Sequence, residues 1–416
     1  MTHHAHHPHH AHHAHHAHDL QDPQRRRWLQ AGLATLALGP AVRWAHAATP
    51  RQPLVVVMLR GALDGLAAVP PTGDPGWSAL RPATAEAPLS PLSPLPLNAD
   101  FSLHPSLAGL HSWYREGQLL VVHAVASPYR ERSHFDAQQL AESGGQRPFD
   151  RDTGWLGRAL AQQAGGAGVA GVSLTPSVPL ALRGTDNATT WTPSRRATPD
   201  ADFMARVGAL YQGDALLKRR WEQVQGQTMG AATDGEPTAD NPSDGRPGTG
   251  ASFTTLATQA GRFLAEPGGP GVAWLELGGW DTHTAQAQRL QRQLATLDAG
   301  LVALRTALGP LWASTTVLVM TEFGRSAALN GSQGTDHGTG AAAFLAGGAV
   351  AGGRVLTDWP GLSTAALLDG RDLRPTTDLR ALQAALVQRH LGVSDAALQS
   401  TVLPGAPRPL ASLWRA

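Results

Sequence analysis

Three histidines of this chain stand beside carboxylate or hydroxyl residues at the ends of short apolar runs. They occur as Ser133-His134, Asp281-Thr282-His283 and Asp336-His337. Imidazole and carboxylate groups in this mixture are the ligands that Zn, Mn and Fe take in proteins. Because the sequence contains no cysteine, a bound transition metal must sit on such groups. The pattern therefore predicts a divalent metal site.

Two further carboxylates follow apolar runs, and each also fits a structural role. Asp64 comes after the run 54–59, where an Asp caps a helix or stabilises a turn about as readily as it binds a metal. Glu322 comes after the run 316–320 and is close enough along the chain to form an ion pair with Arg325. The candidate metal ligands are therefore Asp64, Asp281, His283, Glu322, Asp336 and His337.

The remaining histidines after residue 47 are expected to be structural. His104 and His111 share one helical pattern beside Pro105, and His390 ends the last helical pattern, where the helix dipole favours a cation. His123 lies inside an apolar run, which favours a buried imidazole with a hydrogen-bond partner.

Apolar runs and helical patterns alternate along the chain, and this order predicts the fold class. Runs typical of strands buried on both faces of a parallel sheet cover 54–59, 119–125, 272–277, 316–320 and 343–346. Helical patterns cover 104–115, 133–142, 154–163, 202–223, 254–264, 284–308 and 378–390. The alternation predicts an α/β, doubly wound and mostly parallel sheet with helices on both faces. Since ligands bind at the carboxyl edge of such sheets, the residues that follow the strands are expected to form the site.

Two segments interrupt this order. The segment 81–98 is rich in proline and is expected to be extended on the surface, whereas 226–252 is composed mainly of Gly, Pro, Asp and Thr. The second segment reads as a flexible insertion because it has almost nothing to bury. With these exceptions, residues 48–416 are expected to form a single domain.

The N-terminal 47 residues read as a tract followed by an export signal. Residues 1–18 are mostly His and Ala, typical of a disordered tail or an added tag, although such histidines can also bind metals loosely. Residues 19–47 contain Arg25 and Arg26, a short apolar stretch and an Ala-His-Ala cleavage pattern. This resembles a twin-arginine signal, with an ordinary secretory signal as the alternative. The apolar stretch is too short to span a bilayer. We therefore expect cleavage, export to the periplasm by the twin-arginine machinery and no permanent membrane anchor.

Composition excludes several classes of function. The 33 basic and 32 acidic residues give a net charge of +1, which offers no electrostatic basis for binding nucleic acid. The single lysine, Lys218, lies outside any Walker A pattern and offers no obvious Schiff-base site. The absence of cysteine excludes disulfides and iron–sulfur clusters ligated by thiolates.

Six motifs, in this order along the chain, carry a resemblance to a known family. They are Leu-Arg-Gly-Ala-Leu-Asp-Gly (59–65), Arg-Ser-His-Phe-Asp-Ala-Gln (132–138), Gly-Trp-Leu-Gly-Arg (154–158), Gly-Gly-Trp-Asp-Thr-His (278–283), Thr-Glu-Phe-Gly-Arg (321–325) and Gly-Thr-Asp-His-Gly (334–338). This set resembles the bacterial family known as domain of unknown function 1501, in which a twin-arginine-like leader is usual. That family is in turn similar to the alkaline phosphatase superfamily of phosphatases and sulfatases.

The resemblance implies roles for individual residues. By position, Asp64 resembles the metal ligand after the first strand, and Ser133 resembles the nucleophile at a helix start. Asp281 with His283 resembles a later ligand pair, and His337 resembles the final histidine ligand. Where the superfamily usually has Asp followed by His, this chain has Glu322 followed by Phe323, which puts a second metal in doubt. The sulfatase signature with its modified residue is missing, so sulfatase chemistry of that type is not expected.

The implied function is an exported, metal-dependent hydrolase of phosphate or sulfate esters. The expected partner is a small anionic ester, with one divalent Zn, Mn or Fe ion bound and room for a second. The candidate catalytic residues are Ser133, His134 and Arg325, with Arg325 expected to neutralise the oxygens of the transferred group. The alternative is a periplasmic partner protein on the same fold that binds a metal or ligand without catalysing a reaction.

Overall fold

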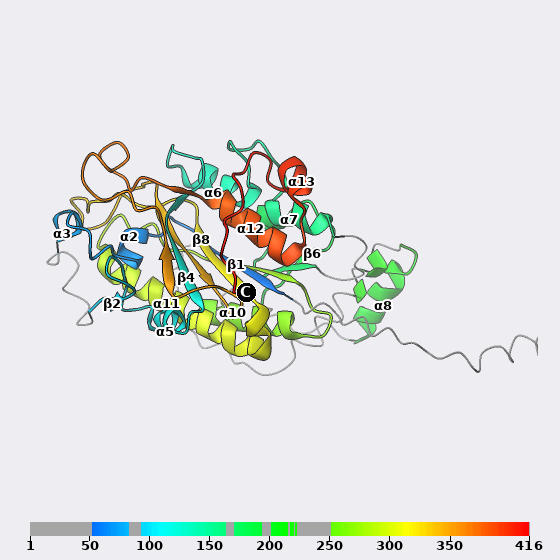
Figure 1. The fold of residues 1–416 in the computed structure, drawn as a ribbon. Helices are drawn as coiled ribbons and strands as arrows, with labels where there is room; N and C mark the ends of the chain where they lie inside the picture. The colour runs from blue at the N-terminus through cyan, green and yellow to red at the C-terminus, as the bar shows by residue number, and fades with distance from the viewer. Residues whose placement is uncertain are drawn as a thin grey trace, which may run out of the picture. The chain divides into compact units, whose positions relative to one another are not determined.

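A nine-stranded sheet forms the centre of the fold in the computed structural model (Figure 1). The structure describes residues 52–82, 93–163, 170–193, 201–214, 217–219, 221–222 and 251–415. The chain divides into two compact units, 1–49 and 50–416, and the first lies outside the described residues. The predicted His/Ala tract and export signal, most of the Pro-rich segment 81–98 and nearly all of the insertion 226–252 also lie outside them.

The sheet is mostly parallel, as predicted. Its strands follow the order β10-β4-β9-β8-β1-β7-β5-β6, and β11 also pairs with β4. The strands are β1 (Leu54–Leu59), β4 (Leu119–Ala126), β5 (Gly171–Ser173), β6 (Ala188–Thr190), β7 (Val272–Leu277), β8 (Thr316–Thr321), β9 (Ala341–Ala346), β10 (Arg354–Leu356) and β11 (Thr377–Asp378). Within the described part of this sheet, only the pairings of β9 with β4 and β8 are antiparallel. A separate hairpin joins β2 (Leu95–Pro96) and β3 (Ser102–Leu103).

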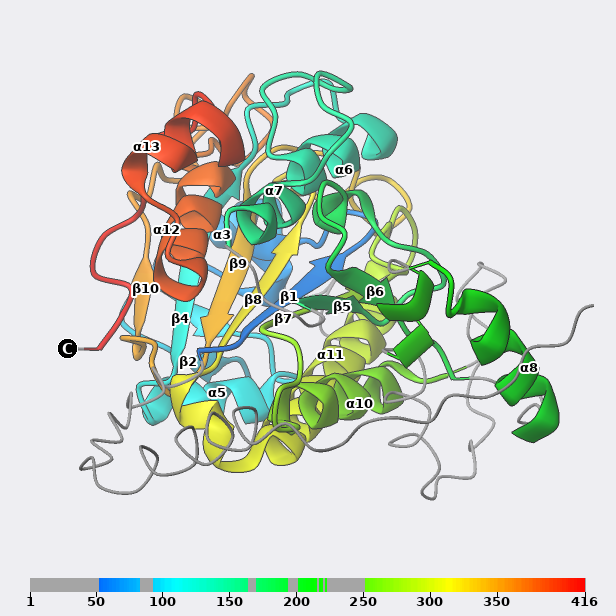
Figure 2. The same ribbon diagram turned by 90° about the vertical axis from the view of Figure 1, so that its right-hand side faces the viewer.

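Helices cover both faces of the sheet, because both faces of each central strand are apolar (Figure 2). In β1, the side chains of Val55, Val57 and Leu59 pack into one core cluster, and those of Leu54, Val56 and Met58 pack into another. The first cluster includes α5 (Ala108–Arg115), α10 (Phe253–Ala265) and α11 (Gln286–Leu308). The second includes α7 (Trp155–Ala161), α12 (Leu379–Leu391) and part of α6 (His134–Ser143).

Shorter elements complete the described fold. They are α2 (Gly65–Ala68), α3 (Trp77–Leu80), α8 (Ala201–Tyr211), α13 (Asp395–Ala397) and the turns of helix at Leu180–Leu182, Gly309–Ser314 and Leu398–Val402. The helix predicted over 202–223 is not continuous, since α8 ends at Tyr211 and a turn follows. The predicted helix over 104–115 begins instead at Ala108, four residues after the start of the pattern.

One described helical segment, Gln286–Ser314, is long and apolar enough to cross a membrane by length and composition. Core helices of soluble proteins pass the same test. Within this segment, α11 packs Leu290, Leu294, Leu297, Leu301 and Leu304 into the first core cluster. We therefore describe it as a core helix.

Candidate metal centre

One edge of the sheet gathers residues from four strands. Glu322 directly follows β8, Asp281 follows β7, and His134 begins α6 in the connection after β4. His337 instead precedes β9. Because β9 runs antiparallel to its neighbours, its beginning lies at the same edge as the carboxyl ends of β4 and β8. The sheet thus brings these side chains together although they are far apart in the sequence.

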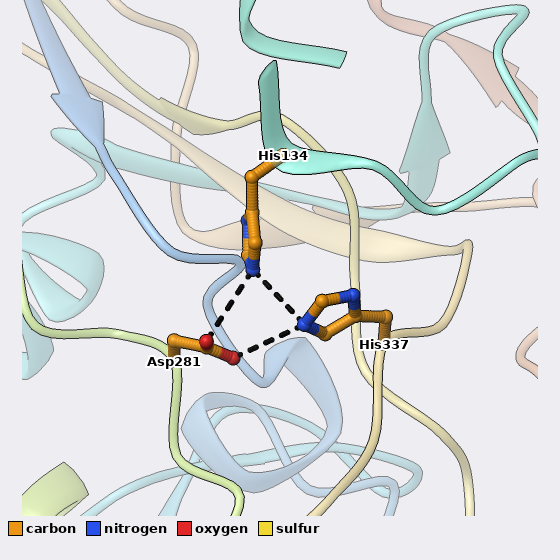
Figure 3. A group of neighbouring side chains, drawn as sticks. All are labelled: His134, Asp281 and His337. Carbon is orange, nitrogen blue, oxygen red and sulfur yellow. Dashed lines mark hydrogen bonds and ion pairs between the residues drawn. The ribbon is translucent and has the colours of Figure 1, made fainter. Parts of the chain in front are cut away.

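His134, Asp281 and His337 form a group that could hold a metal ion, with their ligand atoms all within 4.8 Å of one another. Figure 3 shows the three side chains pointing toward one another from three separate segments. The two imidazole Nε2 atoms are 3.0 Å apart. Asp281 places Oδ2 3.5 Å from Nε2 of His134 and Oδ1 3.3 Å from Nε2 of His337. Asp281 is half-exposed, so the group is open to solvent on one side.

His283 lies against this group. Its Nε2 is 3.0 Å from Oδ1 of Asp281 and 3.0 Å from Nε2 of His337. Its Nδ1 lies 3.3 Å from Oδ1 of Asp336, which also accepts a hydrogen bond of 3.0 Å from the Asn330 amide. Asp336 therefore contacts the far side of the His283 ring and does not join the converging group.

Each of the three imidazoles has an acceptor beside Nδ1. Oε1 of Glu322 is 2.9 Å from Nδ1 of His134, and the backbone carbonyl oxygen of Arg132 is 2.9 Å from Nδ1 of His337. Asp336 occupies the same position for His283. A ring that donates from Nδ1 presents an Nε2 lone pair, which is the arrangement in which protein histidines bind metals. All three rings thus turn their metal-binding nitrogens toward Asp281.

Glu322 is fully buried and orients His134 instead of joining the converging atoms. Besides His134, its Oε1 accepts hydrogen bonds from the Gly61 N–H at 2.8 Å and the Gln138 amide at 2.9 Å. Burial alone would raise the pKa of Glu322, but the hydrogen bonds from His134 and Gln138 outweigh it and lower the pKa. The ligand role predicted for Glu322 is replaced by this supporting one.

Arg325 forms an ion pair with Asp281. Its guanidinium is fully buried, with Nη1 2.5 Å from Oδ1 of Asp281 and Nε donating to Oγ1 of Thr335 at 3.1 Å. Nη2 also donates to the Thr335 carbonyl. The pair expected with Glu322 is thus formed with Asp281. The guanidinium is therefore enclosed and bonded to Asp281 and Thr335.

The structure gives Asp64 a capping role. Its Oδ1 accepts a hydrogen bond of 3.1 Å from the Ala67 N–H in the first turn of α2. Its Oδ2 is 2.7 Å from the Gln286 amide and 2.9 Å from Nη1 of the buried Arg81. The carboxylate is occupied by these donors and is not part of the converging group. Of the two roles weighed for Asp64, the geometry therefore supports the N-cap.

Ser133 occupies the N-cap position of α6, as predicted from the sequence, and directly precedes His134. Its side chain makes no capping hydrogen bond to the described first turn. The neighbouring His134 ring stacks on Phe323, with ring centroids 4.9 Å apart. Phe323 is thus buried beside the His134 ring. It stands at the position where the alkaline phosphatase superfamily, which the motifs resemble, usually has a histidine.

The charges of the group are strongly coupled. Burial lowers the pKa of His134, but the hydrogen bonds to Asp281 and Glu322 prevail and raise the pKa to about 9. Burial tends to raise the pKa of Asp281, whereas hydrogen bonds from His134, His337 and Arg325 hold that pKa far below its usual range. When no metal is bound, a proton on His134 balances the negative charge of the Asp281 carboxylate. The proton also lies between the Nε2 atoms of His134 and His337, whose lone pairs would otherwise repel each other.

Two glycines allow the loops of the site to approach closely. Gly61 has φ +114°, and a Cβ there would lie 2.7 Å from the backbone nitrogen of Asp281. A Cβ on Gly334 would lie 2.2 Å from the backbone carbonyl carbon of His283. Any larger residue at either position would push apart the loops that carry the ligands.

The donor set fits a transition metal of the zinc type. Ligand atoms at 2.0–2.1 Å from one zinc ion are roughly 3.3 Å apart in a tetrahedral site. The separations among the atoms of His134, Asp281 and His337, from 3.0 to 3.5 Å, match this value. The Nε2 atom of His283 lies at similar distances from Asp281 and His337, outside the group of three. The residues present therefore suit one ion.

The sequence identifies the family to which this chain belongs. The model of the family described as "Protein of unknown function (DUF1501)" matches residues 104–403. The chain belongs to the DUF1501 family. This confirms the resemblance carried by the six motifs, five of which lie wholly within the matched residues. None of the curated proteins matches this DUF1501 chain.

Solved structures similar to this DUF1501 protein have low sequence identity. A protein of the alkaline phosphatase superfamily from Vibrio parahaemolyticus is 10% identical, with a TM-score of 0.43, over 87% of this chain and 71% of that chain. The PsFucS1 sulfatase from Pseudoalteromonas sp. is 12% identical, with a TM-score of 0.41, over 90% and 73%. The phosphonate monoester hydrolase of Agrobacterium radiobacter is 12% identical, with a TM-score of 0.35, over 82% and 74%. The strand order and the site geometry, not these alignments, carry the conclusions below.

Two other histidines that the structure describes, His123 and His390, lie beside backbone carbonyl oxygens. His123 is buried with Nε2 3.0 Å from the carbonyl oxygen of Val69, and burial lowers its pKa to about 4. His390 is half-buried, with Nδ1 2.7 Å from the carbonyl oxygen of Gln52, and burial lowers its pKa to about 4. It is therefore neutral at the end of α12, which corrects the expectation of a cation stabilised by the helix dipole.

Proposed function

We propose that this DUF1501 protein is a metal-dependent hydrolase of phosphate or sulfate esters. The observation that carries the proposal is the convergence of the Nε2 atoms of His134 and His337 with the Asp281 carboxylate, while both Nδ1 atoms are bound elsewhere. Holding a carboxylate and two imidazole lone pairs so close together costs free energy unless a cation occupies the centre of the group. The opening to solvent beside Asp281 leaves room for a small anionic ester.

The donor set supports one ion of the Zn, Mn or Fe type, held by His134, Asp281 and His337, with His283 as a further ligand. When bound, such an ion acts as a Lewis acid on the oxygens of the ester and lowers the pKa of a nearby hydroxyl group. Because Glu322 and Asp336 bind the far sides of two ligand rings, they tune the basicity of those rings.

Ser133 is the proposed nucleophile. Ser133 directly precedes His134 and is the N-cap residue of a ten-residue helix, whose first backbone N–H groups favour an anionic group. In the first step, the Ser133 oxygen bonds to phosphorus or sulfur and the ester bond breaks. The departing alcohol takes up the proton that the Ser133 hydroxyl group loses. Water then cleaves the covalent intermediate and restores Ser133.

A binding protein on the same fold is the second candidate, and the burial of Arg325 favours it. The one arginine assigned from the sequence to neutralise a transferred group is enclosed and bonded to Asp281 and Thr335. Metal binding without turnover is compatible with that arrangement. The two candidates differ in whether Ser133 reacts.

The test removes residues 1–47, so that the His/Ala tract cannot contribute loosely bound metal. We expect about one tightly bound transition metal ion per chain after dialysis, measured by elemental analysis, and hydrolysis of aryl phosphate, phosphodiester or sulfate esters. Ser133→Ala should retain the metal and lose turnover. Absence of metal would refute the site, and full activity in Ser133→Ala would exclude Ser133 as nucleophile. Bound metal without turnover of any ester would favour the binding protein.

We further propose that the protein is exported to the periplasm through the twin-arginine pathway. The support is the sequence of residues 19–47, with Arg25 and Arg26 ahead of a short apolar stretch. That pathway exports folded proteins, which suits a metal site assembled from four separate strands.

A further inference from the structure

Asp372 is a fully buried carboxylate outside the group of three candidate ligands. Its Oδ2 accepts a hydrogen bond of 2.9 Å from Nε of Arg132 and lies 2.9 Å from Nη2 of the same guanidinium. Oδ2 also accepts a hydrogen bond of 2.9 Å from Oγ1 of Thr339, and Oδ1 accepts one of 2.9 Å from Nη1 of Arg371. A buried carboxylate costs free energy unless it is paired and hydrogen-bonded. Asp372 therefore fixes the groups that surround it.

The two segments that Asp372 joins both belong to the proposed site. Arg132 directly precedes Ser133, the proposed nucleophile. Thr339 is buried and follows the metal ligand His337 by two residues. One carboxylate oxygen thus bonds the segment that carries Ser133 to the segment that carries His337.

A second contact joins the same two segments. Nδ1 of His337 lies 2.9 Å from the backbone carbonyl oxygen of Arg132. Since a carbonyl oxygen only accepts hydrogen bonds, this contact places the proton of the neutral ring on Nδ1. The lone pair is then on Nε2, the atom that faces Asp281. The Arg132 carbonyl group therefore decides which nitrogen of His337 can bind a metal.

The direction of that carbonyl group depends on an unusual backbone conformation. Arg132 has φ +62°, in the left-handed region that residues with a side chain rarely adopt. Such a conformation persists only where surrounding contacts hold it. The guanidinium is paired with the buried Asp372, whereas another carboxylate partner, Asp369, lies 3.6 Å away and has a side chain that is 71% exposed. The buried pair is therefore the contact that can hold Arg132 in place.

We propose that Asp372 is a positioning residue for the metal ligand His337. Through its ion pair with Arg132 it fixes the carbonyl group that orients the His337 ring, and through Thr339 it holds the residues that follow His337. The inference rests on the metal site of the proposed function and is independent of the ester chemistry. Loss of the Asp372 charge should therefore weaken metal binding, although Asp372 lies outside the ligand group.

The test measures Co²⁺ binding to the full-length protein by chelator competition and by the visible absorption spectrum, which reports the geometry of the ligands. All variants carry the same His/Ala tract, and His337→Ala defines the part of the signal that belongs to the site. We expect Asp372→Asn to bind Co²⁺ about tenfold more weakly than the parent and to shift the spectrum. A change that affected only folding would leave the spectrum of the folded protein unaltered.

Two variants of Arg132 separate the side chain from the backbone. Arg132→Ala removes the anchor and keeps the cost of the positive φ, so it should weaken Co²⁺ binding as much as Asp372→Asn. Arg132→Gly removes the same anchor but adopts a positive φ without that cost, so it should recover part of the lost affinity. Because the Arg132 side chain is partly exposed, these variants decide the question even if Asp372→Asn fails to fold.

Asp369→Asn is the matched control, because it removes a carboxylate near the same guanidinium at an exposed position, and it should bind Co²⁺ like the parent. Parental affinity in Asp372→Asn or in Arg132→Ala, or equal losses in Arg132→Ala and Arg132→Gly, would overturn the inference. Each of these results leaves the proposed function standing as long as His337→Ala loses Co²⁺. An unchanged signal in His337→Ala would refute the metal site and the proposed function with it.

Discussion

Replacing Asp281 with Asn should change how the stability of the metal-free protein depends on pH. The Asp281 carboxylate contacts Arg325 at 2.5 Å, His283 at 3.0 Å and His337 at 3.3 Å. Its pKa lies far below the usual range, because hydrogen bonds from His134, His337 and Arg325 outweigh the effect of burial. It is therefore ionised throughout the working pH range. Asn keeps the size and the acceptor oxygen for Arg325 but removes the charge.

The magnitude follows from His134. Its pKa rises from 6.5 to about 9 because the hydrogen bonds to Asp281 and Glu322 exceed the opposing effect of burial. At about 1.36 kcal/mol per pKa unit, this rise corresponds to roughly 3 kcal/mol of folding free energy. The folded pKa is raised, so this stability is fully present below pH 6.5 and is lost as the pH rises through about 9. Since two carboxylates share the effect, Asp281→Asn should remove about half of it, on the order of 1 to 2 kcal/mol.

The assay is urea unfolding of chelator-treated protein at about pH 6 and about pH 9.5. The loss of stability between the two pH values should be smaller in Asp281→Asn than in the parent. A nuclear magnetic resonance titration of the His134 ring should show a pKa below that of the parent. Asp336→Asn is the matched control, because it removes the same charge from an exposed site beside His283 and leaves the contacts of His134 in place. Identical pH dependence in the parent and Asp281→Asn would show that Asp281 does not hold the proton on His134.

Two further predictions concern the support of the site and its export. Glu322→Gln should lower metal affinity about 10- to 100-fold in a chelator competition, because it removes the negative charge of the buried acceptor that orients His134, and unchanged affinity would contradict the role given to Glu322. Replacing both Arg25 and Arg26 with Lys should trap the precursor in the cytoplasm, as judged by immunoblots of cell fractions, whereas an unchanged periplasmic yield would point to the secretory pathway or to no export.

The central strands were predictable because each is a continuous apolar run buried on both faces. The expected runs at 54–59 and 272–277 coincide with β1 and β7, and the other three differ from the observed strands by two residues or fewer. The short strands β5, β6, β10 and β11 have two or three residues each and were not predicted. Their position is fixed by pairing with a neighbour, so they need no distinctive sequence of their own.

Asp281 and His337 were predictable as candidate metal ligands for a similar reason, whereas His134, the third member of the group, was expected to be a catalytic residue. His337 and Asp281 stand beside strand ends, and residue type with position was enough to suggest metal binding. Asp64 and Glu322 satisfy the same description, yet their carboxylates are occupied by Arg81 and by Gly61 and Gln138. Which carboxylate faces the centre depends on partners distant in sequence. The Arg132 carbonyl beside His337 gives no signal at all, because every residue has a carbonyl group.

The three imidazoles differ in how firmly they are held, and this difference orders the site. His134 is fixed by Glu322, which is fully buried, and His337 by a backbone carbonyl whose own residue, Arg132, is anchored to the buried Asp372 at 2.9 Å. The acceptor for His283 is the exposed Asp336, and the His283 ring is itself more exposed than the other two. An exposed ion pair contributes little to fixing a side chain. Of the three imidazoles around Asp281, His283 is therefore the least firmly held, while His134 and His337 are fixed by buried partners.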